Sequence, residues 1–508
     1  MGINVRCLAS TRVLEDEVQE KETSEEDEKS RDIRVLEGAV EEESRVRELE
    51  EVSEQSDDVT LGGDIEENEP DSPMSSTSSS SSSTTDTDDS SDTTLSDPLQ
   101  HNISCVYEAQ LSPDGTCVFT TDFARQFSVY PIDRGILSNT TTRRLEPYAS
   151  FQSPSPIWAF AVNPLFNLQD ASSTTVLVSR RDSYITLHNA LADTTQTYDV
   201  DDTQPVDISK PLASYKLVNN LTEAIIAPLS LAYSNSRAHF FAGEKDRISV
   251  FDLTDTDEPL YTIDTIPAKR NKLKGGGRGF KGWVSALSLS PPSSTAHDGL
   301  LAVGTWSRYV GIYDPASGRD VTQFALPGTV NGRTFRNRNF KDILGNGVSS
   351  LKWSPCGKYL YIAERNSDVL LLYDVRKFSL GLAHCVGRNA LTNQKLGFDV
   401  CNTGDSPYDI EGLSHEVWAG GTDGCIRVWR DPYAKEGAVE ADEVVKAVPD
   451  GDGTPVVGTL LHPSGSLAIA ACGVLELSED TERRGGRECG GLRPGMREWG
   501  SVDILGLG

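Results

Sequence analysis

The sequence lacks most of the patterns that point to membrane, secreted or metal-binding proteins. No apolar run approaches the roughly 18 residues that a membrane-spanning helix needs, and no apolar secretory segment is present. Arg6 stands where a myristoylation signal beginning at Gly2 requires serine or threonine. The nine cysteines include no C-x-x-C pair, which indicates neither a zinc site nor a disulfide framework. We therefore expect a soluble intracellular protein with reduced thiols, without metal or cofactor.

Catalytic motifs are also missing. The seven histidines are scattered, and neither an H-E-x-x-H nor a G-x-S-x-G pattern occurs. Residues 277–282 match G-x-G-x-x-G, but the following WVSALSLSPP alternates like a strand. A dinucleotide loop needs a helix at that place, because the helix N-terminus binds the phosphates. We predict that the protein is not an enzyme and has no small-molecule substrate.

The first fifth of the chain differs from the rest in charge. Residues 1–100 contain 30 of the 77 acidic residues and only 8 of the 47 basic ones, and they end in a run of serine, threonine and aspartate. Such a segment buries too little apolar area to offset its conformational entropy. We assign residues 1–100 to a disordered acidic tail, which either binds partner proteins or only adds solubility. Residues 101–508 form the folded domain.

One pattern recurs in the folded domain: an alternating strand, a turn, a second strand, another turn, and a third strand that ends in an aromatic-Asp pair or a variant of it. The third strand of the last unit is SVDILGLG at the C-terminus, after an Arg/Gly-rich insertion at about residues 480–497. The turn after the first strand marks seven units: LSPDG (111–115), VNPLF (162–166), AYSNS (232–236), LSPPS (289–293), WSPCG (353–357), VCNTG (400–404) and LHPSG (461–465).

Repeated units of this kind bury their faces against one another and close into a ring. The pattern predicts an all-β fold, a seven-bladed β-propeller of the WD-repeat type with long inter-blade loops. Asp182, Asp246 and Asp423 stand in the turn before a third strand. A carboxylate there accepts hydrogen bonds from the turn and its neighbours, so we expect these three residues to be structural.

Two segments around the fourth unit combine bases with aromatic residues. The first basic segment, residues 268–283, contains Lys269, Arg270, Lys272, Lys274, Arg278 and Lys281 with Phe280 and Trp283. The second basic segment, residues 331–342, contains Arg333, Arg336, Arg338 and Lys341 with Phe335 and Phe340. Because they enter and leave the same blade, we expect them on one face. Bases beside aromatics suit RNA phosphates and unpaired bases, although exposed loops are often basic by chance.

Residues 371–400, LLYDVRKFSLGLAHCVGRNALTNQKLGFDV, resemble the telomerase Cajal body protein family, as do residues 176–191, 242–253 and 282–291. The resemblance implies a WD-repeat propeller that binds small Cajal body RNAs and telomerase RNA. Fungal relatives of that family are associated with pre-mRNA splicing. The chain departs from the family at His188, where tryptophan is usual, and in insertions at 193–212, 405–414 and about 480–497.

We therefore expect a monomeric nuclear protein whose partners are a small nuclear or Cajal body type RNA and the proteins of its ribonucleoprotein. The rival hypothesis is a protein-interaction scaffold whose propeller faces bind peptides without touching RNA. A propeller hydrolase is disfavoured, because nucleophile and base are missing.

Overall fold

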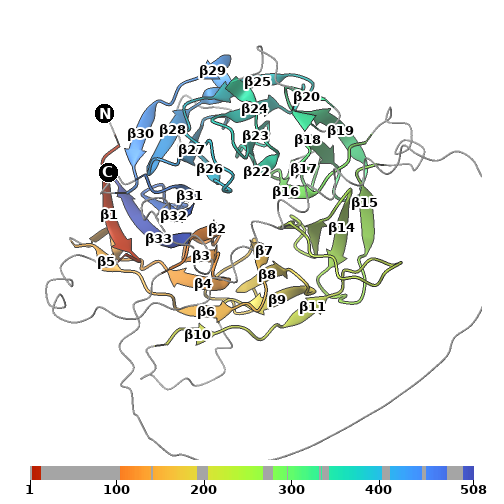
Figure 1. Ribbon diagram of the computed structural model, residues 1–508, viewed down its shortest axis with the longest axis horizontal. Helices are drawn as coiled ribbons and strands as arrows, with labels where there is room; N and C mark the ends of the chain where they lie inside the picture. Colours follow the sequence, from red (N-terminus) through yellow and green to blue (C-terminus); the bar gives the residue numbers. More distant parts are fainter. Residues whose placement is uncertain are drawn as a thin grey trace, which may run out of the picture. The chain divides into compact units, whose positions relative to one another are not determined.

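The computed structural model describes residues 3–12, 103–138, 141–191, 204–266, 279–293, 296–330, 333–334, 342–402, 412–448, 453–477 and 496–508. These residues form one propeller, whose seven blades are arranged in a ring (Figure 1). The predicted fold class is confirmed, and each of the seven marker sequences overlaps the end of the innermost strand of one blade.

Blades one to four follow the chain from the inner to the outer edge. Their strands are β2 (Val106–Leu111), β3 (Cys117–Asp122), β4 (Gln126–Pro131) and β6 (Ala149–Gln152); β7 (Ile157–Val162), β8 (Thr175–Arg180), β9 (Ile185–Asn189) and β11 (Ala213–Tyr215); β12 (Ser230–Tyr233), β13 (His239–Gly243), β14 (Arg247–Asp252) and β15 (Tyr261–Asp264); and β16 (Val284–Leu289), β17 (Leu301–Thr305), β18 (Tyr309–Tyr313) and β19 (Asp320–Ala325).

Blades five and six follow the same order, and blade seven combines both ends of the chain. Their strands are β22 (Val348–Trp353), β23 (Tyr359–Glu364), β24 (Leu370–Asp374) and β25 (Gly381–Cys385); β26 (Phe398–Asn402), β27 (His415–Gly420), β28 (Cys425–Arg430) and β30 (Glu443–Lys446); and β31 (Val456–Leu461), β32 (Leu467–Leu477), β33 (Met496–Leu507) and β1 (Val5–Ser10).

Short elements complete the inventory. The connection between the third and fourth strands of a blade adds a parallel strand to the outer edge of the preceding blade three times, as β5 (Arg143–Arg144), β10 (Val206–Asp207) and β29 (Gly437–Val439). Such pairing covers edge groups that are otherwise open to another chain. A two-stranded hairpin, β20 (Thr329–Val330) with β21 (Arg333–Thr334), follows blade four, and the 3-10 turns are η4 (Ile136–Ser138) and η6 (Pro432–Ala434).

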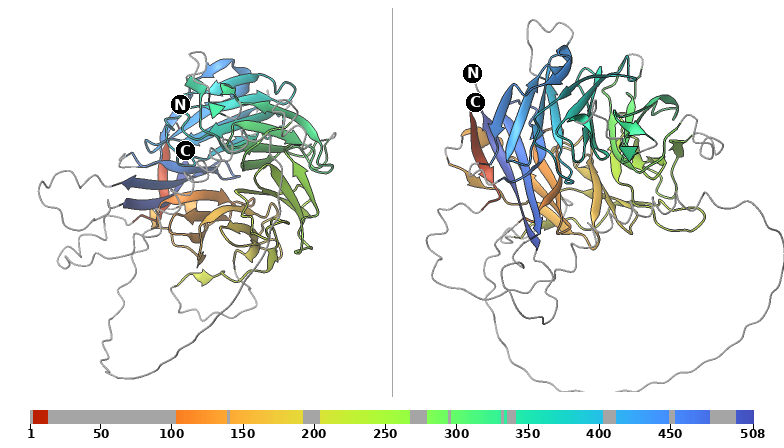
Figure 2. Two further views of the ribbon diagram at one scale, coloured as in Figure 1. Left: turned by 45° about the vertical axis from the view of Figure 1, so that its right-hand side comes forward. Right: turned by 45° about the horizontal axis from the view of Figure 1, so that its top comes forward.

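The N-terminal strand corrects the predicted domain boundary. Residues 1–100 were all assigned to the tail, yet β1 pairs antiparallel with β33 from Val5↔Leu507 to Ser10↔Asp503. Figure 2 shows the two strands side by side. Ser10 Oγ donates to Asp503 Oδ1 over 2.5 Å, and Arg12 Nη2 lies 2.7 Å from Asp503 Oδ2. Residues 3–12 therefore belong to the propeller and close its ring, while the rest of the predicted tail lies outside the described residues.

The middle strands are buried on both sides because each blade packs between two others. In β14 the alternation holds, with Ile248 and Val250 in the cluster that includes blade four. Phe251 faces the opposite way and lies against Tyr215 of blade two, with ring centroids 5.9 Å apart. The core is thus a set of layers between blades, with a channel at the centre.

The turns between second and third strands share a backbone feature. In six blades one residue of this turn has a positive φ: Arg125, Asp182, Asp246, Arg308, Asn366 and Gly424. Asp246 Oδ1 accepts the Gly282 N–H over 2.7 Å, which ties blade three to the end of the first basic segment.

The other two predicted structural aspartates differ from each other in their surroundings. Asp423 forms two bonds of 2.7 Å to the guanidinium of Arg427. Asp182 is exposed and lies 3.3 Å from Arg181 Nε. Asp423 also bonds Asn389, in the connection that follows blade five.

Candidate functional site

The two basic segments flank blade four, and most of their predicted RNA-binding residues lie outside the described part of the chain. Lys281 is described and exposed, and Arg333 is described through its backbone, which pairs with Val330. The remaining predicted residues, apart from Phe280, lie outside the described residues: Lys269, Arg270, Lys272, Lys274, Arg278, Phe335, Arg336, Arg338, Phe340 and Lys341.

The end of the first basic segment and a glycine that follows the second one lie at the same turn, Trp306–Arg308, between β17 and β18. At the end of the first segment, the Lys281 carbonyl accepts a hydrogen bond from Ser307 Oγ. After the second segment, Gly347 packs on the backbone of Trp306, where a Cβ would lie 2.7 Å from the carbonyl oxygen. Gly347 also has a φ of +97°, a backbone conformation that residues with a side chain rarely adopt. Both the lack of space and the backbone conformation therefore favour glycine at this position. We call the side of the propeller with this turn the loop face.

Phe280 does not have the predicted role in base stacking. Its side chain is 4% exposed, and its ring stacks on Tyr309 with centroids 5.8 Å apart and an interplanar angle of 4°. Gly311 makes room for it, because a Cβ there would lie 2.9 Å from the Phe280 ring. The Phe280 N–H donates to the Thr265 carbonyl over 3.2 Å. The Phe280 ring is thus packed inside the protein and is not available to stack on an RNA base.

Residues 371–400, which resemble the telomerase Cajal body protein family, include a segment that runs from blade five towards blades one and seven. We call this segment, residues 392–395, the strap. Blade five fixes its beginning: the Asn366 N–H donates to the Thr392 carbonyl over 2.8 Å, and Arg365 Nη1 donates to the Asn393 carbonyl over 2.8 Å. Blades one and seven fix its end. Gln394 Nε2 donates to the Gly473 carbonyl over 3.3 Å.

Beneath the strap lies a buried cation. The Arg388 side chain is 1% exposed and donates to the carbonyls of Gly420, Leu396 and Gly397 over 3.2, 2.8 and 2.9 Å. Burial lowers the pKa of Arg388 to about 10. The guanidinium is satisfied by backbone oxygens and is not accessible to a phosphate, so its role is to hold the chain on either side of the strap.

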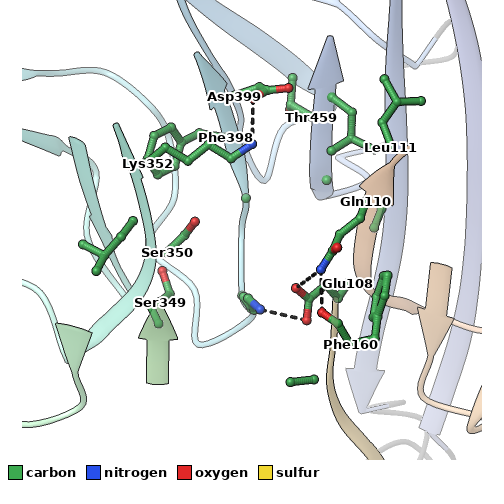
Figure 3. Close-up of a pocket in the computed structure, with 18 of the residues that line it drawn as sticks. Glu108, Gln110, Leu111, Phe160, Ser349, Ser350, Lys352, Phe398, Asp399 and Thr459 are labelled. Atoms are coloured by element: carbon green, nitrogen blue, oxygen red, sulfur yellow. Dashed lines mark hydrogen bonds and ion pairs between the residues drawn. The ribbon is translucent and has the colours of Figure 1, made fainter. Parts of the chain in front are cut away.

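A cavity of about 450 Å³ occupies the central channel and is lined by the first strands of all seven blades (Figure 3). Two ion pairs lie in its lining: Lys352 Nζ lies 2.6 Å from Asp399 Oδ1, and Lys395 Nζ of the strap lies 2.9 Å from Glu108 Oε2. These four residues are the charged members of the lining, and their formal charges cancel. The channel therefore offers no excess positive charge to a polyanion, in contrast to the sequences on either side of blade four.

Other ligand chemistry finds little support in the described residues. Within them, no group of three or more His, Cys, Asp and Glu side chains is arranged to hold a metal ion. No helix among the described residues is long and apolar enough to cross a membrane.

Comparison with known proteins gives distant relatives. No protein-family model matches the chain. It is 28% identical over 334 residues to Guanine nucleotide-binding protein negative regulator 1 of Schizosaccharomyces pombe, covering 64% of this chain and 70% of the relative. It is 26% identical over 237 residues to Protein SWT21 of Vanderwaltozyma polyspora, covering 46% of this chain and 48% of that protein.

A third relative carries the family name. The chain is 27% identical over 209 residues to the Telomerase Cajal body protein 1 homolog of Drosophila melanogaster, covering 41% of this chain and 31% of the relative. The chain thus spans about half or less of the length of two of the three relatives. Together with the seven-bladed fold, these matches agree with the resemblance seen in residues 371–400. The chain is a distant relative of the telomerase Cajal body protein family.

Proposed function

We propose that this protein is a non-enzymatic nuclear propeller that binds a small non-coding RNA or its ribonucleoprotein and supports its localisation or assembly. The relationship to a Cajal body protein supports a role in the nucleus on a ribonucleoprotein. The RNA in question is a small Cajal body RNA, a telomerase RNA or a spliceosomal RNA, and the protein acts on it as a monomer.

The observation that carries the proposal is that the first basic segment ends at the same turn that the chain contacts shortly after the second one. Lys281 in the first segment contacts Ser307, and Gly347, which follows the second segment, contacts Trp306. The two segments hold ten lysines and arginines, with one acid, Asp342, at the very end. The whole chain has a net charge of −30, so a local excess of bases stands out. Bases that neutralise phosphates release counterions, and this supplies most of the sequence-independent affinity for nucleic acid.

A protein-interaction scaffold is the second candidate. The relative from S. pombe is named as a negative regulator of a guanine nucleotide-binding protein, which favours binding to proteins. The charges of the residues that line the channel sum to zero, which also suits a peptide better than a polyanion. The two candidates differ in whether purified protein contacts RNA directly.

Crosslinking the protein to cellular RNA and sequencing the bound fragments tests the proposal. Recovery of small nuclear RNAs supports it, whereas recovery of background messenger RNA alone contradicts it and leaves the scaffold. In a second arm, Lys272, Lys274, Arg278, Arg336 and Arg338 are changed together to Ala. Each lost phosphate contact then lowers the salt slope of binding to single-stranded RNA by about 0.7.

The matched control removes the same charge elsewhere. It changes five exposed bases outside the two segments, Arg134, Lys210, Lys216, Arg319 and Lys377, to Ala. If both variants lose RNA affinity equally, only the net charge matters and the site does not lie on the basic segments.

A further inference from the structure

Two tryptophans meet on the loop face of blade four, at the end of the first basic segment. Trp283 precedes β16 and Trp306 follows β17, and their ring centroids lie 6.5 Å apart at an interplanar angle of 50°. The backbone N–H of Trp306 donates to the backbone carbonyl of Trp283 over 3.1 Å. Both residues are partly exposed, unlike Phe280, and the backbone hydrogen bond between them fixes their relative position.

The indole nitrogen of Trp283 sets it apart from other tryptophans in the blades. Trp353, Trp418 and Trp429 donate their Nε1–H to an oxygen over 3.1, 2.8 and 3.1 Å. Trp283 Nε1 is buried and has no acceptor among the described residues. A buried donor without a partner is costly, and an oxygen atom brought by a ligand removes that cost.

The charge around this pair points to the ligand. Lys281 is exposed and precedes Trp283 by two residues, and Arg278 and Lys274 precede it in the sequence. Two buried carboxylates of the neighbouring blades are already partnered: Glu364 accepts from Nε and Nη2 of Arg308, and Glu244 accepts from Ser249 Oγ. Aromatic rings beside bases bind single-stranded nucleic acid, because the rings stack on unpaired bases while the cations follow the backbone.

We propose that Trp283 and Trp306 form the stacking surface for an unpaired RNA base, and that the protein therefore selects single-stranded over duplex RNA. This inference rests on the proposed function and adds the position and the kind of contact. It moves the aromatic contribution from Phe280, which is buried, to a pair of which one member, Trp306, comes from the turn between β17 and β18 rather than from the basic segments.

The test measures the affinity of full-length protein for a labelled, mixed-sequence, single-stranded RNA oligonucleotide and for the same RNA annealed to its complement. Trp306→Ala and Trp283→Ala are each expected to weaken binding to the single strand about ten-fold and to change duplex binding little. Trp306→Phe keeps a ring and is expected to retain most of the affinity. Trp499→Ala is the control, because Trp499 is 39% exposed on blade seven.

A second readout begins with the wild-type protein, whose fold no substitution disturbs. Tryptophan fluorescence of the wild-type protein should be quenched by the single strand and not by the duplex, and Trp306→Phe should lose part of the quenching. If the wild type binds no RNA, the proposed function fails and this inference with it. If it binds RNA but affinity and quenching are the same in the Trp306 and Trp499 variants, the stacking surface is wrong and the proposed function stands. An equal affinity for duplex also overturns the inference.

Discussion

Arg308 and Glu364 form a buried, two-bonded ion pair that joins blades four and five. Arg308 Nε lies 2.6 Å from Glu364 Oε1 and Nη2 lies 2.8 Å from Oε2, and both side chains are at most 2% exposed. Arg308 belongs to the turn that Lys281 and Gly347 contact, and it has a φ of +63°. Glu364 ends β23. The pair therefore fixes the turn of the candidate site to the next blade.

Removing one partner of this pair should destabilise the propeller strongly. Glu364→Gln leaves the Arg308 guanidinium buried without its counter-charge, and such a loss costs about 3–5 kcal/mol. Urea denaturation followed by tryptophan fluorescence measures it. The exposed residue Glu436 provides the control Glu436→Gln, which should change stability little. Equal stabilities of the two variants would show that the pair contributes nothing.

His188 should make the stability depend on pH. Its side chain is fully buried, with Nδ1 2.9 Å from the Ile208 carbonyl and Nε2 2.9 Å from Thr186 Oγ1, and it stacks on Phe151. Burial lowers the pKa of His188 from 6.5 to about 4. Between these two values the unfolded chain binds a proton that the folded chain does not.

The stabilising contribution of neutral His188 is therefore complete above pH 6.5 and is lost as the pH falls to 4. The loss amounts to about 3 kcal/mol. In His188→Gln this proton-linked loss is absent, so the stability difference between wild type and variant should shrink over that range, while other titrating groups cancel. Exposed His297, as His297→Gln, is the control. A difference that is constant with pH would contradict the assignment.

The blades could be predicted from the sequence because their signals are local. Alternation in strands such as Ile248 to Phe251 and turn residues such as Gly115, Gly357 and Gly465, with φ values of +69° to +74°, lie within a few residues of one another. Each unit can therefore be recognised from its own sequence, and seven such units imply a closed ring.

The parts that could not be predicted depend on distant residues. The strand Val5–Ser10 is six residues long and precedes an acidic tail, and its partner β33 lies at the other end of the chain. Phe280 looked exposed within a Gly- and Lys-rich sequence, but the space that buries it is left by Gly311 of another strand. Trp306 is a candidate because its ring lies beside that of Trp283, a contact that the sequence does not reveal.

The ion pair between Lys395 and Glu108 should hold the strap in place beside the channel. Lys395→Ala removes the bond to Glu108, which is 16% exposed at its side chain, and leaves that carboxylate without its cation. We expect a loss of about 1–3 kcal/mol in stability and faster amide hydrogen exchange in residues 388–397. Lys446→Ala, at an exposed lysine of the outer strand β30, is the control. Unchanged exchange in this segment would mean that the ion pair does not hold the strap.

The N-terminal strand should contribute to stability independently of the tail that follows it. Leu8 is 1% exposed and packs against β33, where a Cβ on Gly506 would lie 3.0 Å from the Leu8 side chain. Leu8→Ala should therefore leave a cavity and cost about 2–5 kcal/mol. Leu221→Ala, at a side chain that is 94% exposed, should cost little.

Thermal and urea denaturation of both variants measure the difference. A chain that uses residues 1–12 only as part of a disordered tail would tolerate Leu8→Ala as well as Leu221→Ala. A large loss at Leu8 alone would instead show that the seventh blade needs its outermost strand, because the ring is closed by pairing β1 with β33. In that case a deletion meant to remove the acidic tail must begin after Arg12, whose guanidinium lies 2.7 Å from Asp503 Oδ2 of the last strand.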